Sequence, residues 1–252
     1  RRVKFTSNSE QNLHLEVTCV CELTMTSWMS HQSHPAYSDL MIVTEANPSE
    51  YTLIAKRKYK DEPSNLTYAC MVASSKSGDI SAFSYDTDFL TFMGRNRDYE
   101  NPKSMEANAP LSGNHGAVIT PCFSMRCMIS VPAGESDTLA FTLGYAESRD
   151  AIYEIVDKFR NIRNTERALS LAETRCVIEQ EYVEVLPGER KAFLSTLSHI
   201  VFMSPVRILF SGAISRGQDI VASLWELGIS GDNPIVTVFA QKIENYNFLE
   251  RM

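Results

Sequence analysis

The sequence predicts a mainly β protein, in which an antiparallel β-sandwich is followed by helices. Apolar side chains repeat with a period of two from residue 1 to about 147, and with a period of 3.6 from about 148. The strand-like segments follow one another without helical segments between them, which favours antiparallel pairing over an alternating α/β fold. We therefore expect two units, strands first and helices second.

The clearest strand-like segment has apolar residues at every second position from Leu13 to Cys21, as in a strand with one buried face. Residues 39–45 form a short apolar run, typical of a strand that is buried on both faces. A turn is expected at residues 132–135, where a proline is followed by a glycine. The remaining expected strands are 51–55, 66–72, 80–83, 122–131 and 138–145.

Three helices are expected after residue 147. The first has Ser148 as its N-cap and Asp150 in its first turn, where a negative charge is favoured. The second is expected from about 165 to 185, and the third begins near Glu189 and stops before Pro205. Their apolar stripes are, in order, Ala151, Ile152, Ile155, Val156 and Phe159; Leu169, Ala172, Cys176 and Val183; Phe193, Leu194, Leu197, Ile200 and Val201.

Composition and charge narrow the classes of function. The net charge of −7 argues against a nucleic-acid partner and is compatible with a neutral ligand such as a sugar, among others. No run of about 18 apolar residues predicts a membrane-spanning helix. The chain starts without Met and stops at residues 248–252 without a helix cap, so we expect an interior segment of a longer protein.

The six cysteines predict neither a metal site nor a disulfide framework. Cys19 and Cys21 lie on one strand face, but no second pair or nearby histidine follows at ligand spacing. His31 and His34 are too sparse for a metal site, and residues 30–35 are expected to be a polar loop. We expect core or strand-face thiols in a reducing cytoplasm. No nucleophile elbow, phosphate-binding loop or dinucleotide fingerprint is present.

Two loop-like segments hold the candidate ligand-binding residues. In residues 92–98, two arginines flank an asparagine, and their planar donors suit phosphate or sugar hydroxyls. The alternative, favoured on the residues alone, is a loop held by salt bridges to Asp86, Asp88 or Asp98. In residues 225–235, Trp225 is either a sugar-stacking platform or, more commonly, a buried anchor. The candidates are Arg95, Asn96, Arg97, Trp225, Ser230 and Asp232.

Five segments stand out in order: HPAYSDL at 34–40, DFLTFMGRNR at 88–97, the run from 112 to 126, LGYAESR at 143–149 and GISGDNPI at 228–235. Together they resemble segments of the cyclic β-1,2-glucan synthases and 1,2-β-oligoglucan phosphorylases of glycoside hydrolase family 94, the glycosyltransferase-36-like group. Their order and rough spacing hold across nearly all 252 residues. Asn96 stands where the synthases often have Gly, and Asn114 and His115 replace a pair of small residues.

The resemblance implies a β super-sandwich, a helical linker, an (α/α)6 barrel with the active site, and a second β-sandwich. On that plan residues 1–147 are the later part of the super-sandwich, 148–210 are the helical linker and 211–252 are the truncated start of the barrel. The family reaction is inverting phosphorolysis of a β-glucoside or its reverse, with an Asp as general acid. That Asp lies downstream of the last similar segment, so the resemblance assigns no catalytic residue here.

The resemblance also implies the partners. They are a β-glucan or oligosaccharide, phosphate or glucose 1-phosphate as co-substrate, and a second copy in a homodimer, with no cofactor and no metal. Arg95 and Arg97 are expected on an exposed loop near the junction with the barrel or at a dimer contact. The protein is expected in the cytoplasm, and at the membrane if the parent is the synthase. The alternative function is a non-catalytic carbohydrate-binding or assembly module.

Overall fold

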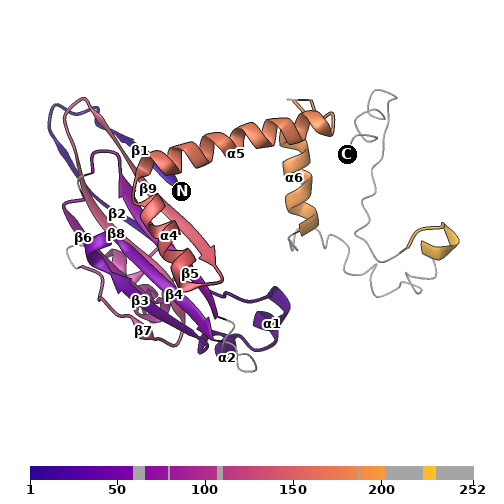
Figure 1. Cartoon of the computed structure of the whole chain (residues 1–252), viewed down its shortest axis with the longest axis horizontal. Helices are drawn as coiled ribbons and strands as arrows, with labels where there is room; N and C mark the ends of the chain where they lie inside the picture. The colour runs from indigo at the N-terminus through magenta and orange to yellow at the C-terminus, as the bar shows by residue number, and fades with distance from the viewer. Residues whose placement is uncertain (59–65, 79, 107–109, 187, 202–223, 231–252) are drawn as a thin grey trace. The chain divides into compact units, whose positions relative to one another are not determined.

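The computed structural model describes residues 1–58, 66–78, 80–106, 110–186, 188–201 and 224–230 (Figure 1). The chain divides into two compact units, Arg1–Ser170 and Leu171–Met252. Each unit is described by itself. The described strands all belong to the first unit.

The first unit contains two antiparallel β-sheets, which confirms the predicted sandwich. The larger sheet has six strands in the order β1-β9-β5-β4-β3-β7, and the smaller has three in the order β2-β8-β6. Their bounds are β1 Arg2–Thr6, β2 Leu13–Glu22, β3 Ile42–Asn47, β4 Thr52–Lys58, β5 Leu66–Ser75, β6 Ala82–Asp88, β7 Gly116–Ala117, β8 Pro121–Val131 and β9 Ser136–Ala146.

The main core lies between the two sheets. Because side chains alternate along a strand, one face of β8 points inward throughout. The inward residues Phe123, Met125 and Ile129 are at most 1% exposed, and they pack with Leu53 and Met71 of the larger sheet. Each such side chain stabilises the fold by about 1.5–3 kcal/mol through burial. The turn predicted at 132–135 is confirmed: Gly134 has φ +71° and the amide of Glu135 donates to the carbonyl of Pro132 over 3.1 Å.

Helix α4, Arg149–Phe159, covers the other face of the larger sheet (Figure 1). It is capped as predicted, because the Ser148 hydroxyl accepts a hydrogen bond from the amide of Ala151 at 3.2 Å. Its predicted stripe is confirmed at Ile152 and Val156, which are fully buried. They form a second cluster with Ile54, Tyr68, Cys70, Val72 and Ala146. The larger sheet is therefore the middle layer of three.

The thiols belong to the fold. All six cysteines are free, and Cys19, Cys70, Cys122 and Cys127 are buried. Burial raises the pKa of the Cys70 thiol to about 11 and that of Cys127 to about 12, which keeps these thiols protonated and unreactive. The predicted role of the cysteines as core residues is confirmed for these four.

The segment before β3 differs from the prediction. Residues 30–35 are not a polar loop, because α1, Trp28–Ser33, is followed directly by α2, Pro35–Asp39. The Ser27 hydroxyl caps α1, and Pro35 starts α2 with a backbone angle suited to a first helical turn. The strand expected at 39–45 therefore begins only at Ile42, and β3 is fully buried on one face alone.

The later helices lie close to their predicted positions. Helix α5 spans Ile162–Tyr182 and α6 spans Arg190–Val201. The stripe expected on α5 is not buried, since Leu169 and Val183 are 40% and 55% exposed. Residues 211–252 lie outside the described residues except for 224–230, so the expected start of a barrel stays a prediction. No helix among the described residues is long and apolar enough to span a bilayer.

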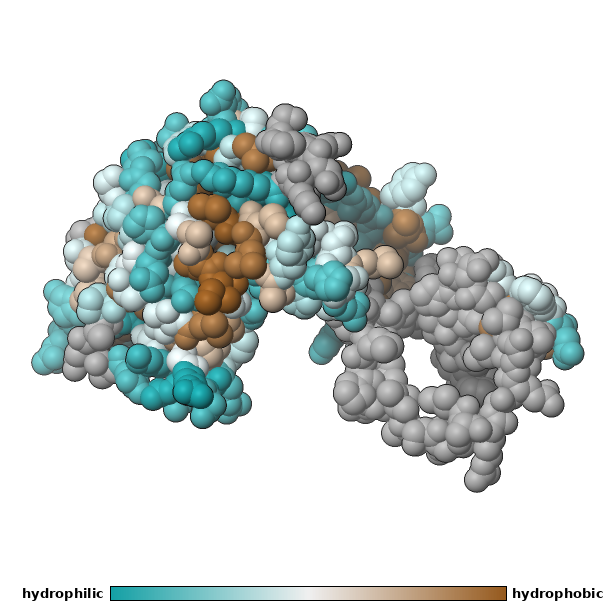
Figure 2. Space-filling model, turned by 90° about the horizontal axis from the view of Figure 1, so that it is seen from below, coloured by the Kyte–Doolittle hydropathy of each residue, from teal (hydrophilic) through white to brown (hydrophobic). Residues whose placement is uncertain are grey.

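One face of the first unit carries a band of hydrophobic side chains flanked by hydrophilic ones (Figure 2). Large apolar side chains of this unit that stay exposed include Leu40, Leu90 and Ile119. Part of the apolar surface of the described residues is therefore not buried in the core.

The close contact between α4 and the larger sheet is tested at Gly144. A Cβ there would lie 2.7 Å from Ile155 Cγ2 and 2.8 Å from Cys70 Sγ. Gly144→Ala should lower the free energy of unfolding by about 1–3 kcal/mol, as over-packing does, measured by urea denaturation. Ile155→Ala removes one clashing group, so the losses should be less than additive in the double variant. Additive losses would contradict the contact.

Candidate functional site

A segment of the first unit, residues 89–106 and here named the cover segment, contacts the smaller sheet on the face that points away from the core. It begins with α3, Phe89–Met93, whose N-cap Asp88 accepts hydrogen bonds from the amide of Leu90 and the hydroxyl of Thr91. It ends with the 3₁₀ turn η2, Lys103–Met105. The Tyr99 hydroxyl donates to the carboxylate of Glu22, at the end of β2.

The backbone of the cover segment turns at two residues with positive φ. Gly94 has φ +80°, and a Cβ there would lie 2.6 Å from Lys103 Cβ, so only glycine fits. Asn96 has φ +58°, in a region that asparagine tolerates better than most residues. Asn96 stands where the similar segment of the synthases often has Gly. Both residues can adopt positive φ, so the turn is compatible with either of them.

The predicted arginines lie on the exposed surface of this turn. Arg97 forms an ion pair with Glu106, which closes the loop within the cover segment. The alternative prediction was a salt bridge to Asp86, Asp88 or Asp98, but the partner of Arg97 is Glu106 instead. The three aspartates accept hydrogen bonds from nearby backbone amides. Arg95 makes no ion pair or hydrogen bond with a described residue.

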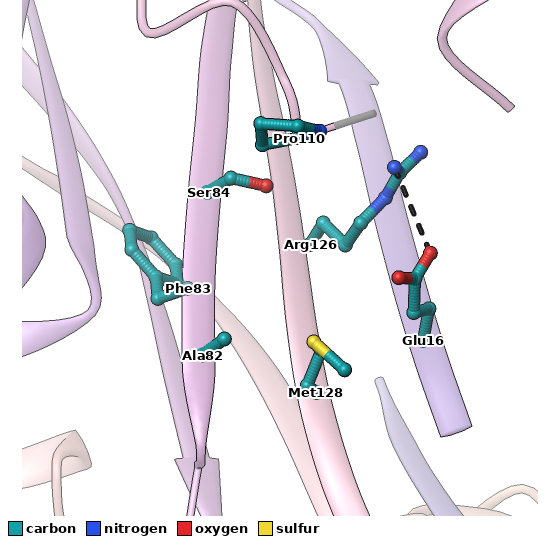
Figure 3. A pocket seen from close by; sticks show the side chains of 7 residues that line it. All are labelled: Glu16, Ala82, Phe83, Ser84, Pro110, Arg126 and Met128. Carbon is teal, nitrogen blue, oxygen red and sulfur yellow. Dashed lines mark ion pairs between the residues drawn. The ribbon is translucent and has the colours of Figure 1, made fainter. Parts of the chain in front are cut away.

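A pocket of about 310 Å³ opens on the outward face of the smaller sheet, beside the cover segment (Figure 3). Arg126 of β8 is only 5% exposed. Its Nε donates to Thr18 Oγ1 at 3.0 Å and its Nη2 to the carbonyl of Ser104. Its Nη1 lies 3.8 Å from a carboxylate oxygen of Glu16, on the neighbouring strand. The lining residues are Glu16, Ala82, Phe83, Ser84, Pro110, Arg126 and Met128.

This pocket has the chemistry of a binding site for polar groups. Figure 3 shows the side chains of Arg126 and Glu16 extending toward each other from adjacent strands. A guanidinium donor opposite a carboxylate acceptor can hold hydroxyl groups, and Met128 and Pro110 supply an apolar wall. Within the described residues, no three His, Cys, Asp or Glu side chains are grouped so that they could hold a metal ion.

The second polar cluster holds the turn at residues 112–116 in place. The carboxylate of Asp86, fully buried, accepts hydrogen bonds from the Ser112 hydroxyl and from the amide of Asp88 at 2.9 Å. The Thr87 hydroxyl donates to the carbonyl of Asn114 at 3.0 Å. Burial raises the pKa of Asp86 above its usual range, although these hydrogen bonds act in the opposite direction.

The other predicted site residues belong to the second unit. Trp225 lies in a short helical turn and is 69% exposed, so within its unit it is not the buried anchor that was the commoner expectation. Ser230 is exposed just after this turn. Asp232 lies outside the described residues. Trp225 and Ser230 thus belong to a different unit from Arg95, Asn96 and Arg97, and their grouping in one site stays a prediction.

Sequence reasoning missed Arg126, and it considered Asp86 only as a salt-bridge partner of the arginine loop. A signal for Arg126 was present, because it is the one charged residue in the otherwise apolar or small segment 122–131. A charge in such a strand must find partners if its face is covered. Nothing local marked the outward face of β8 as covered, since the covering residues come from another part of the chain.

Removing the Arg126 side chain should release the cover segment. Arg126→Ala leaves Thr18 and the carbonyl of Ser104 without their buried donor, so the free energy of unfolding should fall by about 2–3 kcal/mol. Urea denaturation measures the loss, and limited proteolysis should show faster cleavage within residues 89–106. The matched control Arg95→Ala removes an exposed guanidinium and should change stability by no more than about 0.5 kcal/mol. Equal losses in the two variants would contradict the role of Arg126.

Asp86 predicts a pH dependence of stability. Its raised pKa means that the folded protein holds this proton more tightly than the unfolded chain does. The stabilisation is complete below the unfolded pKa of about 3.9 and is lost as the pH rises through the folded pKa. Asp86→Asn does not titrate, so the stability of the wild type relative to this variant should fall as the pH rises from about 4 to 7. Urea denaturation across this range checks it, and a relative stability that increases with pH would contradict the shift.

Two comparisons with known proteins agree with this architecture. Residues 1–162 match the family described as glycosyl hydrolase 94, supersandwich domain. The chain is also similar to the cyclic β-(1,2)-glucan synthase NdvB of Rhizobium meliloti (strain 1021), with 24% identity over 236 residues. This similarity covers 93% of the chain and 8% of the synthase, so the chain spans a small part of that relative's length. The match over most of its residues shows that the chain belongs to glycosyl hydrolase family 94 and carries a supersandwich domain of that family.

Proposed function

We propose that this chain is a non-catalytic part of a longer enzyme that acts on β-1,2-glucan, by inverting phosphorolysis or by the reverse synthesis. The observation that carries the proposal is the supersandwich match over residues 1–162, together with the similarity to a cyclic β-(1,2)-glucan synthase. The proposal includes phosphate or glucose 1-phosphate as co-substrate, a homodimer, and a place in the cytoplasm or at its membrane.

The two described aspartates with a raised pKa lie outside the candidate pocket, and this supports a non-catalytic role. A general acid has to hold a proton at the working pH and reach the glycosidic oxygen. Burial raises the pKa of both Asp39 and Asp86. Asp86 is engaged with Ser112 and the amide of Asp88, and Asp39 lies 3.8 Å from His31 Nδ1. Neither lines the pocket beside Arg126.

The alternative, a free-standing carbohydrate-binding or assembly module, uses the same sandwich without a partner barrel. It predicts that the full-length product of the gene binds a glucan and does not cleave it. The enzyme proposal predicts phosphorolysis by the full-length product, with the catalytic acid outside the residues that the structure describes.

The purified chain should not release glucose 1-phosphate from β-1,2-glucooligosaccharides in the presence of phosphate, because general-acid catalysis is worth about 10²–10⁴-fold in rate and depends on a group supplied elsewhere. The full-length product of the gene, assayed beside it, should release glucose 1-phosphate. Turnover by the chain within about a hundredfold of the full-length product would show that the acid is among these 252 residues. Inactivity of both would contradict the enzyme proposal and favour the binding module.

A further inference from the structure

Strand β2 forms an edge of the smaller sheet that no described strand covers. It pairs with β8 over all ten of its residues, from Leu13 to Glu22, without a bulge, and no other described strand pairs with it. Its sequence, LHLEVTCVCE, contains neither proline nor lysine, the residues that commonly protect such an edge from pairing with another chain. The backbone groups on its outer side are therefore accessible to a further strand.

The other described sheet edges are short or protected. At the opposite edge of the smaller sheet, β6 has an irregular register between Asp86 and Asp88, and the amide of Gly113 donates to its Tyr85 carbonyl over 2.8 Å. In the larger sheet, the edge strand β7 has two residues and β1 has five, two of which are basic. Among the described edges, β2 is thus the one long strand that lacks a feature opposing further pairing.

The free edge of β2 carries the backbone groups of its even-numbered residues. The amide of Leu23, directly after β2, donates to the carbonyl of Pro121 on β8 over 3.0 Å. In an antiparallel pair, the residues that hydrogen-bond their direct partner recur at every second position, so the odd-numbered residues of β2 bond to β8. The amides and carbonyls of residues 14, 16, 18, 20 and 22 therefore point to the free edge.

These groups are complementary to those of a second β2 that runs antiparallel about a two-fold axis at Thr18. In this register residue 14 faces 22, residue 16 faces 20 and residue 18 faces its own copy, so about ten backbone hydrogen bonds can form. Side chains on the inward face then meet in apolar pairs, with Val17 opposite Cys19 and Leu15 opposite Cys21. A shift by two residues would leave free groups at the ends of β2 unpaired.

The charged side chains of β2 favour the same register. His14 of one copy lies opposite Glu22 of the other, and both side chains are exposed. Tyr99 donates to one oxygen of this carboxylate, which leaves the second oxygen for the imidazole. Pairs of opposite charge stabilise neighbouring strands and like charges destabilise them. A two-fold axis at Glu16 would place that carboxylate opposite its own copy, so the axis at Thr18 is preferred.

We propose that two copies of this chain associate through their β2 strands, which joins their three-stranded sheets into one continuous antiparallel sheet. The partner is a second copy because the free backbone groups and the pair of His14 and Glu22 are self-complementary, as a two-fold interface requires. The existence of a homodimer rests on the proposed function, whereas the surface assigned to it follows from the geometry of β2.

Val20→Pro tests the edge directly. A proline at this even-numbered position removes a donor on the free side and leaves the hydrogen bonds to β8 in place. Size-exclusion chromatography with light scattering should find the wild-type chain as a dimer and this variant as a monomer. Val20→Thr keeps the amide and is the matched control, which should remain a dimer. Urea denaturation of both variants verifies that each is folded.

The charge pair is tested at His14. His14→Glu places two carboxylates opposite each other and should raise the dissociation constant of the dimer about tenfold. His14→Lys restores a positive charge opposite Glu22 and should dimerise at least as tightly as the wild type. Sedimentation equilibrium measures both constants, and equal constants for the two variants would contradict the register.

Cysteine cross-linking tests the position of the axis. Opposed residues of a hydrogen-bonded pair have Cα atoms about 5.5 Å apart, within the range of a disulfide, so Thr18→Cys should cross-link two copies under mild oxidation. His14→Cys is the control, because the two copies of residue 14 lie roughly 26 Å apart along the strands. The wild type measures the background from the native thiols, all of which are free.

A wild-type chain that stays monomeric at high micromolar concentration overturns the proposal. A dimer that persists in Val20→Pro overturns it as well, although the homodimer of the proposed function then stands on another surface. The same variants are made in the full-length product of the gene. Absence of a cross-link in its Thr18→Cys variant would mean that another segment covers β2. Phosphorolysis is assayed separately, so failure of the enzyme proposal is distinguishable from failure of this interface.

Discussion

The structure depends on one constraint: the larger sheet is a middle layer, so its central strand must be apolar on both faces. Strand β5 meets this constraint, with every residue after Leu66 buried. Its inward side chains include Ala69 and Ala73, which leave room for the large residues of β8. Its outward side chains include Cys70 and Val72, which pack under α4. The positions of the smaller sheet and of α4 follow from these two faces.

Local periodicity was sufficient for the elements that have one long buried face. The alternation from Leu13 to Cys21 predicted β2, and the stripe after Ser148 predicted α4. The short helices α1 and α2 contain too few residues to show a helical period, so the signals available were a serine cap and a proline. Strand order was not predictable in the same way, because β1 pairs with β9 across most of the unit.

The candidate site was predicted less well than the fold, for a related reason. Arg97 was recognised, but its partner Glu106 comes from the same loop and no spacing rule marks it. Arg126 has an ordinary outward strand position and becomes buried only because the cover segment contacts it. Tyr145 has an inward position on β9 and is nevertheless 58% exposed. For Arg126 and Tyr145, tertiary packing reversed the environment that alternation along the strand indicates.

The placement of β8 and β9 has a consequence for how the chain folds. These strands are consecutive, yet β8 is the central strand of the smaller sheet and β9 pairs with both β1 and β5 in the larger one. The smaller sheet cannot reach its native order until β8 has been synthesised, and the larger sheet cannot until β9, the last of the described strands, has followed it. Until then the early strands have unpaired edges. Closing a long loop costs conformational entropy before the strand contacts can compensate for it, and this slows folding. During synthesis, β1 and β2 emerge roughly 130 and roughly 100 residues before their partners β9 and β8, and until then their edges are open to pairing with a wrong strand.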